Sequence, residues 1–514
     1  MARQSVAAPV KTRLANTATL PAPLGGWNTR DPWARMPPND AIALDDFICR
    51  TNYVELRKGQ TQFANSPSSS VVKSLYTYRG SLNQKMLAGT DAGIYDISSG
   101  AFGSAAIARS NGYNWFVNLN TAGGYYLVTG NGVDAEYHFD GTSWAANSNS
   151  GVAGPFTSGK LLHQRIFMTK AGSTSFFYYG LNSIQGAVSE YPMGTIFNKG
   201  GQLIAIEAWT LDAGQGITDF TVMVTDQGQV AVWQGYDPTN ASTWNLVGVF
   251  DLAIPMGGAK CLLKYGGDVL LMCQDGIWNM SKGLLSSSID RDVSISNKIQ
   301  SQFLYAYANY ASFKGWDMLL YSPEGILMFN IPTSNDGTSA HQYVMNTITK
   351  AWSRFTGFPA TCFTVFNGLF YFGTAGGVRQ GLTTYADLGT NDIIGKAATA
   401  YNYFKSPGAE KQLTMMRPTF QFGLPVNTQM GISPDFTTSP YYSPSTGSSG
   451  NQALWDTGVW DTDLWAFDVV VNSDWNSVTA YPGYCFSTLL QVATQKTGFS
   501  WISTDYLYTA GGPL

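Results

Sequence analysis

The chain has 514 residues, of which 12% are charged and 14% are aromatic, and its formal net charge is −4. The charged share is about half of the roughly 25% typical of soluble domains, so we expect the chain to bury much of its surface or to cover it with partners in an assembly. A large β protein with many Asn, Ser and Thr residues on its outside is the alternative. The acidic balance and the lack of a Lys/Arg run disfavour tight nucleic-acid binding through phosphate neutralisation, but they are compatible with a wall past which nucleic acid slides.

The cysteines and the chain's hydropathy bear on its compartment. Five scattered cysteines without a CxxC pair argue against a disulfide scaffold or a zinc ribbon, and reduced, buried thiols are expected. No apolar run is long enough to predict a transmembrane helix, and the first twenty residues lack the continuous apolar stretch of a secretory signal. We therefore expect synthesis and folding in a cytoplasm.

Residues 1–65 are predicted to form an N-terminal arm and a cap segment. Residues 1 to about 19 are small and weakly patterned, which predicts a flexible or partner-bound arm. Asn39 or Asp40 is expected to cap a short helix that continues to Ile48. Residues 53–59 follow as a strand and a turn.

Residues 66–390 repeat one pattern, in which two short apolar strands flank a turn that contains glycine. The stretch from Val269 to Met280, with Asp275-Gly276 at its turn, is the clearest copy, because glycine accepts the positive φ of a tight hairpin. The seven turn glycines are Gly93, Gly132, Gly172, Gly228, Gly276, Gly325 and Gly377, at intervals of 39, 40, 56, 48, 49 and 52 residues.

A unit of roughly 40–50 residues made of short strands is typical of a β-propeller blade. We predict a propeller of six to eight blades, with seven as the best match to the turn repeats, although any all-β chain contains many glycine turns. Residues 180–202 and 281–310 break the pattern and are interpreted as insertions. The part from Ser286 to Ala306 allows either a helix or a strand.

Residues 391–514 are predicted to form a second, sandwich-like β domain. A Ser/Pro/Gly-rich loop from Thr437 to Gln452 precedes a segment in which Trp455, Trp460 and Trp465 recur every five residues. The acidic residues between these tryptophans allow a calcium or sugar site. We favour the simpler interpretation, a loop whose tryptophans plug the core and whose aspartates form turns.

The opening segment contains four short stretches in a fixed order: Gly25-Gly26-x-Asn28, Met36-Pro37-Pro38-x-Asp40-Ala41, Leu44-Asp45-Asp46 and Glu55-Leu56-Arg57-Lys58-Gly59. In these stretches the chain resembles the propeller-bearing tail proteins of short-tailed bacteriophages, known as nozzle, tail hub or tail tubular protein B. The resemblance is sharp over roughly residues 20–64 and architectural beyond them. Asp46 stands where Asn is expected, and Trp27 stands where a smaller apolar residue is commoner.

The resemblance implies a structural virion protein rather than an enzyme. It implies a homo-hexameric ring below the portal and adaptor proteins, with tail fibres or spikes beside or below it, in the virion tail after synthesis in the host cytoplasm. Double-stranded DNA would pass without sequence-specific binding, and contact with the host envelope is a further expectation. By itself, the opening segment is also explained as a cap that closes the propeller by strand exchange.

No residue is nominated as catalytic, cofactor-binding or metal-binding. His138, His163 and His341 lie about a blade or more apart, and neither a metal-ligand spacing, a GxSxG turn nor a phosphate-binding glycine loop occurs. The first alternative function is a propeller glycosidase. It is suggested by the distant likeness of residues 225–233 to an Asp-box turn, but glycoside hydrolysis needs two placed carboxylates.

Candidate carboxylates exist at Glu136, Glu207 and Glu324, but their spacing nominates no pair. The second alternative function is a receptor- or glycan-binding tail protein that holds sugar through Trp455, Trp460 and Trp465. Such a protein needs an exposed aromatic face, whereas a ring subunit would bury its aromatic residues at subunit contacts.

Overall fold

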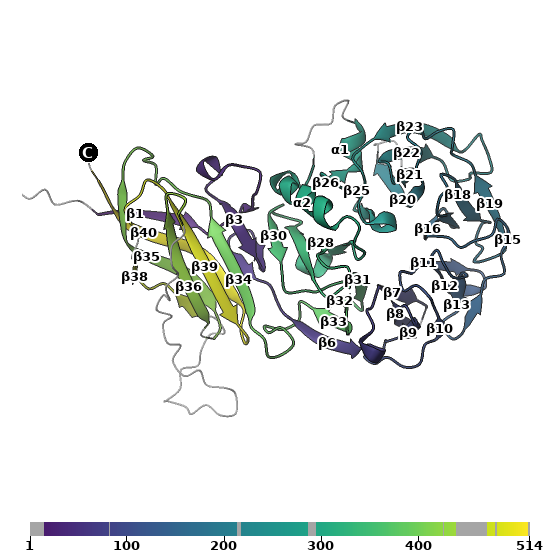
Figure 1. The fold of residues 1–514 in the computed structure, drawn as a ribbon, viewed down its shortest axis with the longest axis horizontal. Helices are drawn as coiled ribbons and strands as arrows, with labels where there is room; N and C mark the ends of the chain where they lie inside the picture. Colours follow the sequence, from purple (N-terminus) through teal and green to yellow (C-terminus); the bar gives the residue numbers. More distant parts are fainter. Residues whose placement is uncertain are drawn as a thin grey trace, which may run out of the picture. The chain divides into compact units, whose positions relative to one another are not determined.

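The structure is a computed structural model that describes residues 15–81, 83–212, 217–285, 294–424, 426–437, 470–478 and 481–511. The chain divides into two compact units, one made of Met1–Arg57 with Asn391–Leu514 and one made of Lys58–Thr390 (Figure 1). The second unit begins eight residues before the predicted boundary at residue 66. The predicted N-terminal segment 1–65 is therefore divided between the two units.

The unit from Lys58 to Thr390 consists of seven small sheets in the described residues. Each has three or four consecutive antiparallel strands, and the last sheet adds β6 from the start of the unit. The first three sheets are β7 (Ser74–Arg79), β8 (Gln84–Thr90), β9 (Gly93–Asp96) and β10 (Ile107–Ala108); β11 (Trp115–Thr121), β12 (Gly124–Gly130), β13 (Tyr137–Phe139) and β14 (Trp144–Ala146); and β16 (Ser158–Leu162), β17 (Arg165–Thr169), β18 (Phe176–Tyr179) and β19 (Ala187–Tyr191), with β15 (Ser150–Gly151) parallel to β19. The fourth and fifth sheets are β20 (Leu203–Asp212), β21 (Ile217–Thr225), β22 (Gln229–Gln234) and β23 (Asn245–Asp251); and β24 (Leu262–Tyr265), β25 (Asp268–Cys273) and β26 (Gly276–Asn279). The sixth and seventh sheets are β27 (Asp317–Tyr321), β28 (Ile326–Pro332), β29 (Ala340–Asn346) and β30 (Trp352–Phe355); and β31 (Cys362–Phe366), β32 (Leu369–Thr374), β33 (Gly377–Gly381) and β6 (Gln60–Asn65).

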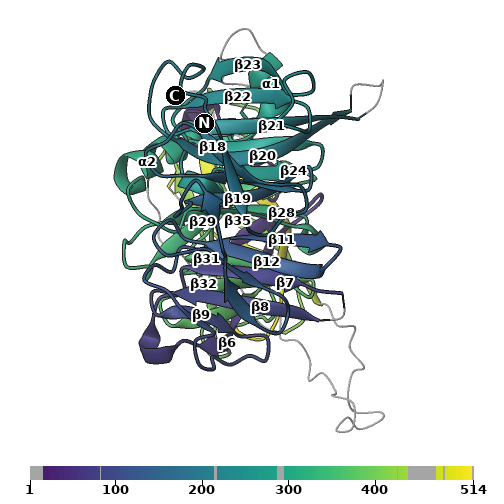
Figure 2. The same ribbon diagram turned by 90° about the vertical axis from the view of Figure 1, so that its right-hand side faces the viewer.

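These seven sheets close into a ring, which makes the unit a seven-bladed β-propeller. The first strand of each sheet contacts the first strand of the next, from β7 through β11, β16, β20, β24, β27 and β31 back to β7. Figure 1 shows the sheets arranged around a common centre, and Figure 2 shows β7, β11 and β20 from the side. The predicted propeller, with seven as its best blade number, is confirmed.

The last blade takes its outer strand from the beginning of the chain. β6 pairs antiparallel with β33, from Gly377 opposite Asn65 to Gly381 opposite Gln60. Val72, which follows β6, donates its backbone N–H to Thr374 O at 3.1 Å. The opening segment thus closes the propeller by strand exchange, which covers an edge of the last sheet that would otherwise be unpaired.

The turn glycines occupy equivalent positions in six of the seven blades. Six of them lie between the second and third strands, whereas Gly325 joins the first and second strands of its blade, β27 and β28. The equivalent turn in that blade is the longer loop 333–339, which contains Gly337 at φ +73°. Gly325 differs from the other six because a one-turn 3-10 helix at Ser322–Glu324 also ends in a left-handed glycine.

The two predicted insertions differ from each other. In the described residues after β26, α1 (Met280–Leu285) and α2 (Gln300–Tyr310) stand where other blades have a fourth strand. The buried Phe303 of α2 packs edge-on against Phe329 and Tyr343 of the next blade. Residues 180–202, by contrast, contain the fourth strand β19 of their blade, so the pattern is interrupted there only by the following loop.

The other unit is a sandwich of two sheets, as predicted for residues 391–514. One sheet contains β2 (Gly26–Trp27), β3 (Asp40–Asp45), β34 (Ile393–Thr399), β39 (Phe486–Thr494) and β36 (Asn427–Pro434). The other contains β37 (Val470–Asn472), β35 (Lys411–Phe422), β40 (Phe499–Ala510), β5 (Val54–Leu56) and β4 (Phe47–Cys49), with β1 (Ala15–Pro21) beside β40 and β38 (Asn476–Ser477) beside β35.

The two sheets of the sandwich face each other across an apolar core. A Cβ atom on Gly395 of the first sheet would lie 2.4 Å from Leu56 and 2.8 Å from Phe47 of the second. The buried hydroxyls of Thr488 and Tyr506 also form a hydrogen bond between the sheets. The predicted flexible arm is wrong for residues 15–19, because they belong to β1, which pairs with β40.

The predicted helix from Asn39 or Asp40 to Ile48 is wrong, since these residues form β3 and β4. The carboxylate of Asp40 does not cap a helix but accepts a hydrogen bond from Asn28 at 2.7 Å. Asp46 has a φ of +62° and separates the two strands. The apolar residues Ala41 and Leu44, whose spacing suits a helix, are buried in the sandwich instead.

Ring closure is testable at two adjacent glycines. In Gly377→Ala the new Cβ would lie 2.0 Å from Ala64 O of β6, at a φ of +139°, so we expect unfolding to become easier by about 2–3 kcal/mol. Gly376→Ala is the matched control, because a Cβ there meets no atom within 4 Å. Denaturant unfolding of the two variants checks this, and equal stability of both would contradict it.

Candidate functional site

The propeller has a cavity at each end of its inner strands. The wide cavity, of about 810 Å³, takes Leu75 from the start of β7 and Asp317 from the start of β27. The narrow cavity, of about 590 Å³, takes Thr77 and Leu320 from further along the same strands. The two cavities share lining residues where they meet: Phe116, Asn118 and Phe363.

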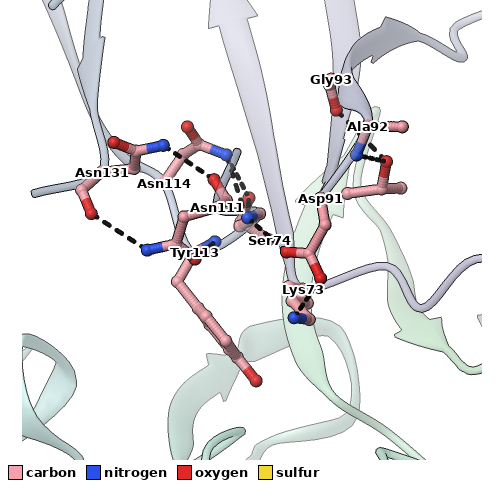
Figure 3. Close-up of polar contacts among 11 residues, drawn as sticks. Lys73, Ser74, Asp91, Ala92, Gly93, Asn111, Tyr113, Asn114 and Asn131 are labelled. Atoms are coloured by element: carbon pink, nitrogen blue, oxygen red, sulfur yellow. Dashed lines mark hydrogen bonds and ion pairs between the residues drawn. The ribbon is translucent and has the colours of Figure 1, made fainter. Parts of the chain in front are cut away.

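One side of the wide cavity is formed by the rim loop, defined here as residues 109–114, which joins the first two blades. Ser74 Oγ donates to Gly112 O at 2.7 Å, and Asn114 Nδ2 donates to the same carbonyl at 3.1 Å (Figure 3). Gly112 N donates to Asp91 Oδ1 at 2.9 Å. A side chain at residue 112 would meet Thr90 C at 2.8 Å, so only glycine lets the rim loop lie this close to the first blade.

The rim loop is also tied to the turn of the second blade. Asn111 Nδ2 donates to Asn131 O at 3.2 Å, and Asn131 Nδ2 donates to Asn111 O at 2.8 Å. The carboxylate of Asp134 accepts from Ser110 Oγ at 2.6 Å. The rim loop is therefore held by the first blade's turn, through Asp91, and by the second blade's turn, through Asn131. These bonds fix the side chains that the rim loop presents to the cavity.

Tyr113 is the rim-loop residue whose ring extends away from this amide network, as Figure 3 shows. The ammonium of Lys73 lies 5.1 Å from the centre of the ring. Burial, assisted by the nearby Asp91 and Cys362, raises the pKa of Tyr113 to about 12. The phenol therefore stays protonated at neutral pH and lines the cavity as a hydrogen-bond donor.

Four lysines from different parts of the ring line the wide cavity: Lys73, Lys160, Lys260 and Lys314. Lys160 Nζ lies 2.5 Å from Glu207 of the next blade, and Lys260 Nζ lies 2.5 Å from Asp317 of the next blade. The carboxylate side chains are only 5% and 10% exposed, whereas the two lysines are 44% and 40% exposed. In both pairs the carboxylate is the more buried partner.

Asp317 joins three consecutive blades at the cavity wall. Its Oδ2 atom accepts from Lys260 Nζ at 2.5 Å and from the backbone N–H of Phe363 at 3.0 Å, and its Oδ1 atom accepts from Met318 N at 3.0 Å. Such charge-assisted bonds are stronger than neutral ones, so the wall of the wide cavity is also a structural joint of the ring.

The structure does not bring the three histidines together. His138 Nδ1 lies 2.8 Å from Asn147 Oδ1 in the second blade, and His163 occupies the β16–β17 turn at a φ of +48°. His341 lies on β29 with its ring against Tyr343. Across the described ranges, no group of three His, Cys, Asp or Glu residues is arranged to hold a metal ion.

The carboxylates considered for glycoside hydrolysis also lie in different blades. Glu136 accepts from Phe156 N at 2.9 Å, Glu207 pairs with Lys160, and Glu324 pairs with Lys58 at 2.8 Å. The turn that resembles an Asp box has a structural role, since Asp226 accepts from Gln202 N at 3.0 Å and Trp233 is buried.

The segment from Trp455 to Trp465 lies outside the described residues, and so does the loop from Thr437 to Gln452 beyond Thr437 itself. No helix among the described residues has the length and apolar character to cross a membrane. The sequence contains no lysine cluster, yet the fold gathers four lysines, each 54 to 100 residues from the next along the chain. No local pattern could have indicated this grouping, because each lysine comes from a different repeat or connection.

No family model and no curated protein matches the chain. Among solved structures, the chain is similar to the extracellular domain of a putative hybrid two-component system from B. thetaiotaomicron, with 13% identity over 74% of this chain and 51% of that one and a TM-score of 0.41. It is also similar to the β-propeller domain of Swd1 from Myceliophteria thermophila, with 12% identity over 62% and 99% of the two chains and a TM-score of 0.39.

A third similar structure is an exo-β-1,3-galactanase from Phanerochaete chrysosporium, with 8% identity over 76% and 95% of the two chains and a TM-score of 0.24. The chain spans about half the length of the first of these proteins. Likenesses this distant carry no functional argument, and the propeller assignment follows from the ring of sheets described above.

His341 gives a pH-dependent prediction. Burial, with the nearby charge of Arg354, lowers its pKa from 6.5 to about 4. Between pH 6.5 and 4 the unfolded chain binds a proton that the folded chain does not, so this residue lowers stability as the pH falls through that window. NMR titration of the imidazole, assigned with His341→Gln, should give a midpoint near 4, and stability of the variant should depend less on pH there. A midpoint near 6.5 would contradict the burial of this ring.

Proposed function

We propose that the chain is a structural virion protein, a subunit of a ring-shaped tail nozzle of a short-tailed bacteriophage. In this role it extends the portal–adaptor channel, retains packaged DNA and conducts the DNA during ejection. One observation carries the proposal: the polar residues Asn28, Asp40, Asp46 and Arg57 of the nozzle-like motif are buried and fix the fold of the opening segment, and this same segment supplies the strand that closes the propeller.

The first half of the motif is held by Asn28 and Asp40, which are 1% and 2% exposed. Asn28 Nδ2 donates to Asp40 Oδ2 at 2.7 Å and to Asp31 Oδ2 at 2.9 Å. A side chain at Gly25 would lie 1.9 Å from Asp40 Oδ1, so the glycine is required by this network. The spacing of glycine, asparagine and aspartate in the motif thus has a physical cause in the fold.

The second half of the motif is held by Asp46 and Arg57. Arg57 Nε donates to Asp46 Oδ1 at 2.5 Å, and the side chains of Arg57 and Asp46 are 1% and 3% exposed. Removing one partner of such a buried pair costs about 3–5 kcal/mol. Two residues further on, Gly59 N donates to Thr384 O at 2.6 Å inside the propeller unit. The motif therefore leads directly into the closing strand β6.

A closed ring of sheets suits a mechanical role. Neighbouring blades are joined by hydrogen bonds such as Asn118 Nδ2 to Thr77 O at 2.9 Å, between two first strands, and Trp115 Nε1 to Phe156 O at 2.7 Å, just before β16. Such a body resists deformation by the pressure of packaged DNA. Opening during infection is then a movement of loops or subunits and includes no covalent step.

The assembly itself is the test of this proposal. We expect the purified chain, mixed with the portal and adaptor proteins, to join them as a ring of six copies, measured by native mass spectrometry and by imaging of the tail. A chain that stays monomeric and never joins the tail would overturn the proposal. Hydrolysis of host glycans or of a fluorogenic sialoside would support the glycosidase instead, and cell binding lost in Trp460→Ala would support the receptor binder.

A further inference from the structure

We propose that the wide cavity of the propeller is a binding site for a small polyanion that carries phosphate or carboxylate groups. The inference is independent of the tail role, because it depends only on the side chains that line one end of the ring. Four lysines line this cavity, and Asp317 is the one carboxylate among its lining residues in the described part of the chain.

The arrangement of the ion pairs leaves donors available to a ligand. An ammonium group has three N–H donors, and the structure gives Lys160 and Lys260 one hydrogen-bonded carboxylate oxygen each. Glu207 is buried behind Lys160 and does not line the cavity. Each of these lysines therefore keeps two N–H donors beyond its carboxylate partner, although Asp317 also lines the cavity.

Lys314 and Tyr113 also offer hydrogen-bond donors to a ligand, and neither side chain is paired with a buried carboxylate of the described residues. Lys314 is an exposed lining residue in the connection before β27. The hydroxyl of Tyr113 has no hydrogen-bond partner in the described chain, although the backbone N–H of the residue donates to Asn111 Oδ1 at 3.1 Å. The rim loop that carries Tyr113 is held on both sides, so its donor is preorganised.

The size and the composition of the cavity select the ligand class. A volume of about 810 Å³ is within the usual range for small-molecule sites, and it exceeds the volume of a single phosphate ion. Lysines spread over separate blades suit several anionic groups on one molecule rather than one group. A metal cation is disfavoured, because the lining residues carry more ammonium groups than carboxylates.

The experiment measures binding of pyrophosphate to the full chain by isothermal titration calorimetry at low ionic strength, where exposed charges are least screened. We expect saturable binding with one site per chain. Lys314→Gln and Tyr113→Phe should each weaken it by roughly tenfold, the effect of losing one hydrogen bond to a charged group. Neither change leaves a buried carboxylate unpaired, so both variants should fold.

Glu207→Gln supplies a test of opposite sign. Glutamine keeps one acceptor oxygen, which can accept from Lys160 or from the backbone N–H of Ala208 but not from both, and the substitution removes the negative charge that competes with the ligand. Pyrophosphate affinity should therefore rise in this variant. Lys85→Gln is the matched control, since it removes a lysine that is ion-paired with Asp96 at 3.0 Å but does not line the cavity.

A parallel titration with citrate distinguishes the two sources of negative charge. Tighter binding of pyrophosphate identifies a phosphate-bearing ligand, and tighter binding of citrate identifies a carboxylate-bearing one. Absence of saturable binding of both anions would overturn the proposal. Equal loss of affinity in Lys85→Gln and Lys314→Gln, or unchanged affinity in Glu207→Gln, would overturn it as well.

Discussion

Closure of the ring is the constraint on which the propeller depends. Each of its sheets buries its two faces against its neighbours, so an open array would leave one face and one edge exposed at each end. The chain meets this requirement with β6, whose residues are far from their partner strand β33 in sequence. The contact between β31 and β7, the inner strands of the last and first blades, then completes the circle.

The hairpins could be predicted from the sequence because their signal is local. A glycine at positive φ between two apolar runs has few alternative structures, and Gly228 and Gly276 occupy such turns at φ +79° and +130°. The position of a hairpin within its blade is not local, so the sequence does not reveal that Gly325 lies in a different turn from the other six glycines. The sequence around Gly325 and the sequence around Gly337 both specify a tight turn, and only the pairing of β28 with β29 distinguishes them.

The helix predicted from residue 39 or 40 shows how a distant partner overrides a local signal. Asp40 suits a helix cap, but its carboxylate is bonded to Asn28, and its strand pairs with β34, which lies some 350 residues further along the chain. The lysines of the wide cavity illustrate the same limit for the candidate site. Their grouping is a consequence of the circular arrangement, which places equivalent ends of all inner strands at one opening.

The nozzle proposal and the polyanion proposal rely on different parts of the chain. The first rests on the buried motif from Gly25 to Gly59, which explains a family-like sequence by the demands of folding and closure. The second rests on the lysines and Tyr113, which are partly accessible and make little contribution to the core. Three of the four lysines already have a carboxylate partner, so the polyanion proposal depends on the N–H donors that these pairs leave over and on Lys314.

The most direct test of closure by β6 is hydrogen exchange measured on the native full-length chain. If β6 completes the last blade, its backbone amides in the ladder with β33 should exchange about as slowly as those of β32, in the centre of the same sheet, because both then open only with the blade. Exchange of the β6 amides at the rate of an unprotected peptide, with β32 still protected, would contradict the closed ring.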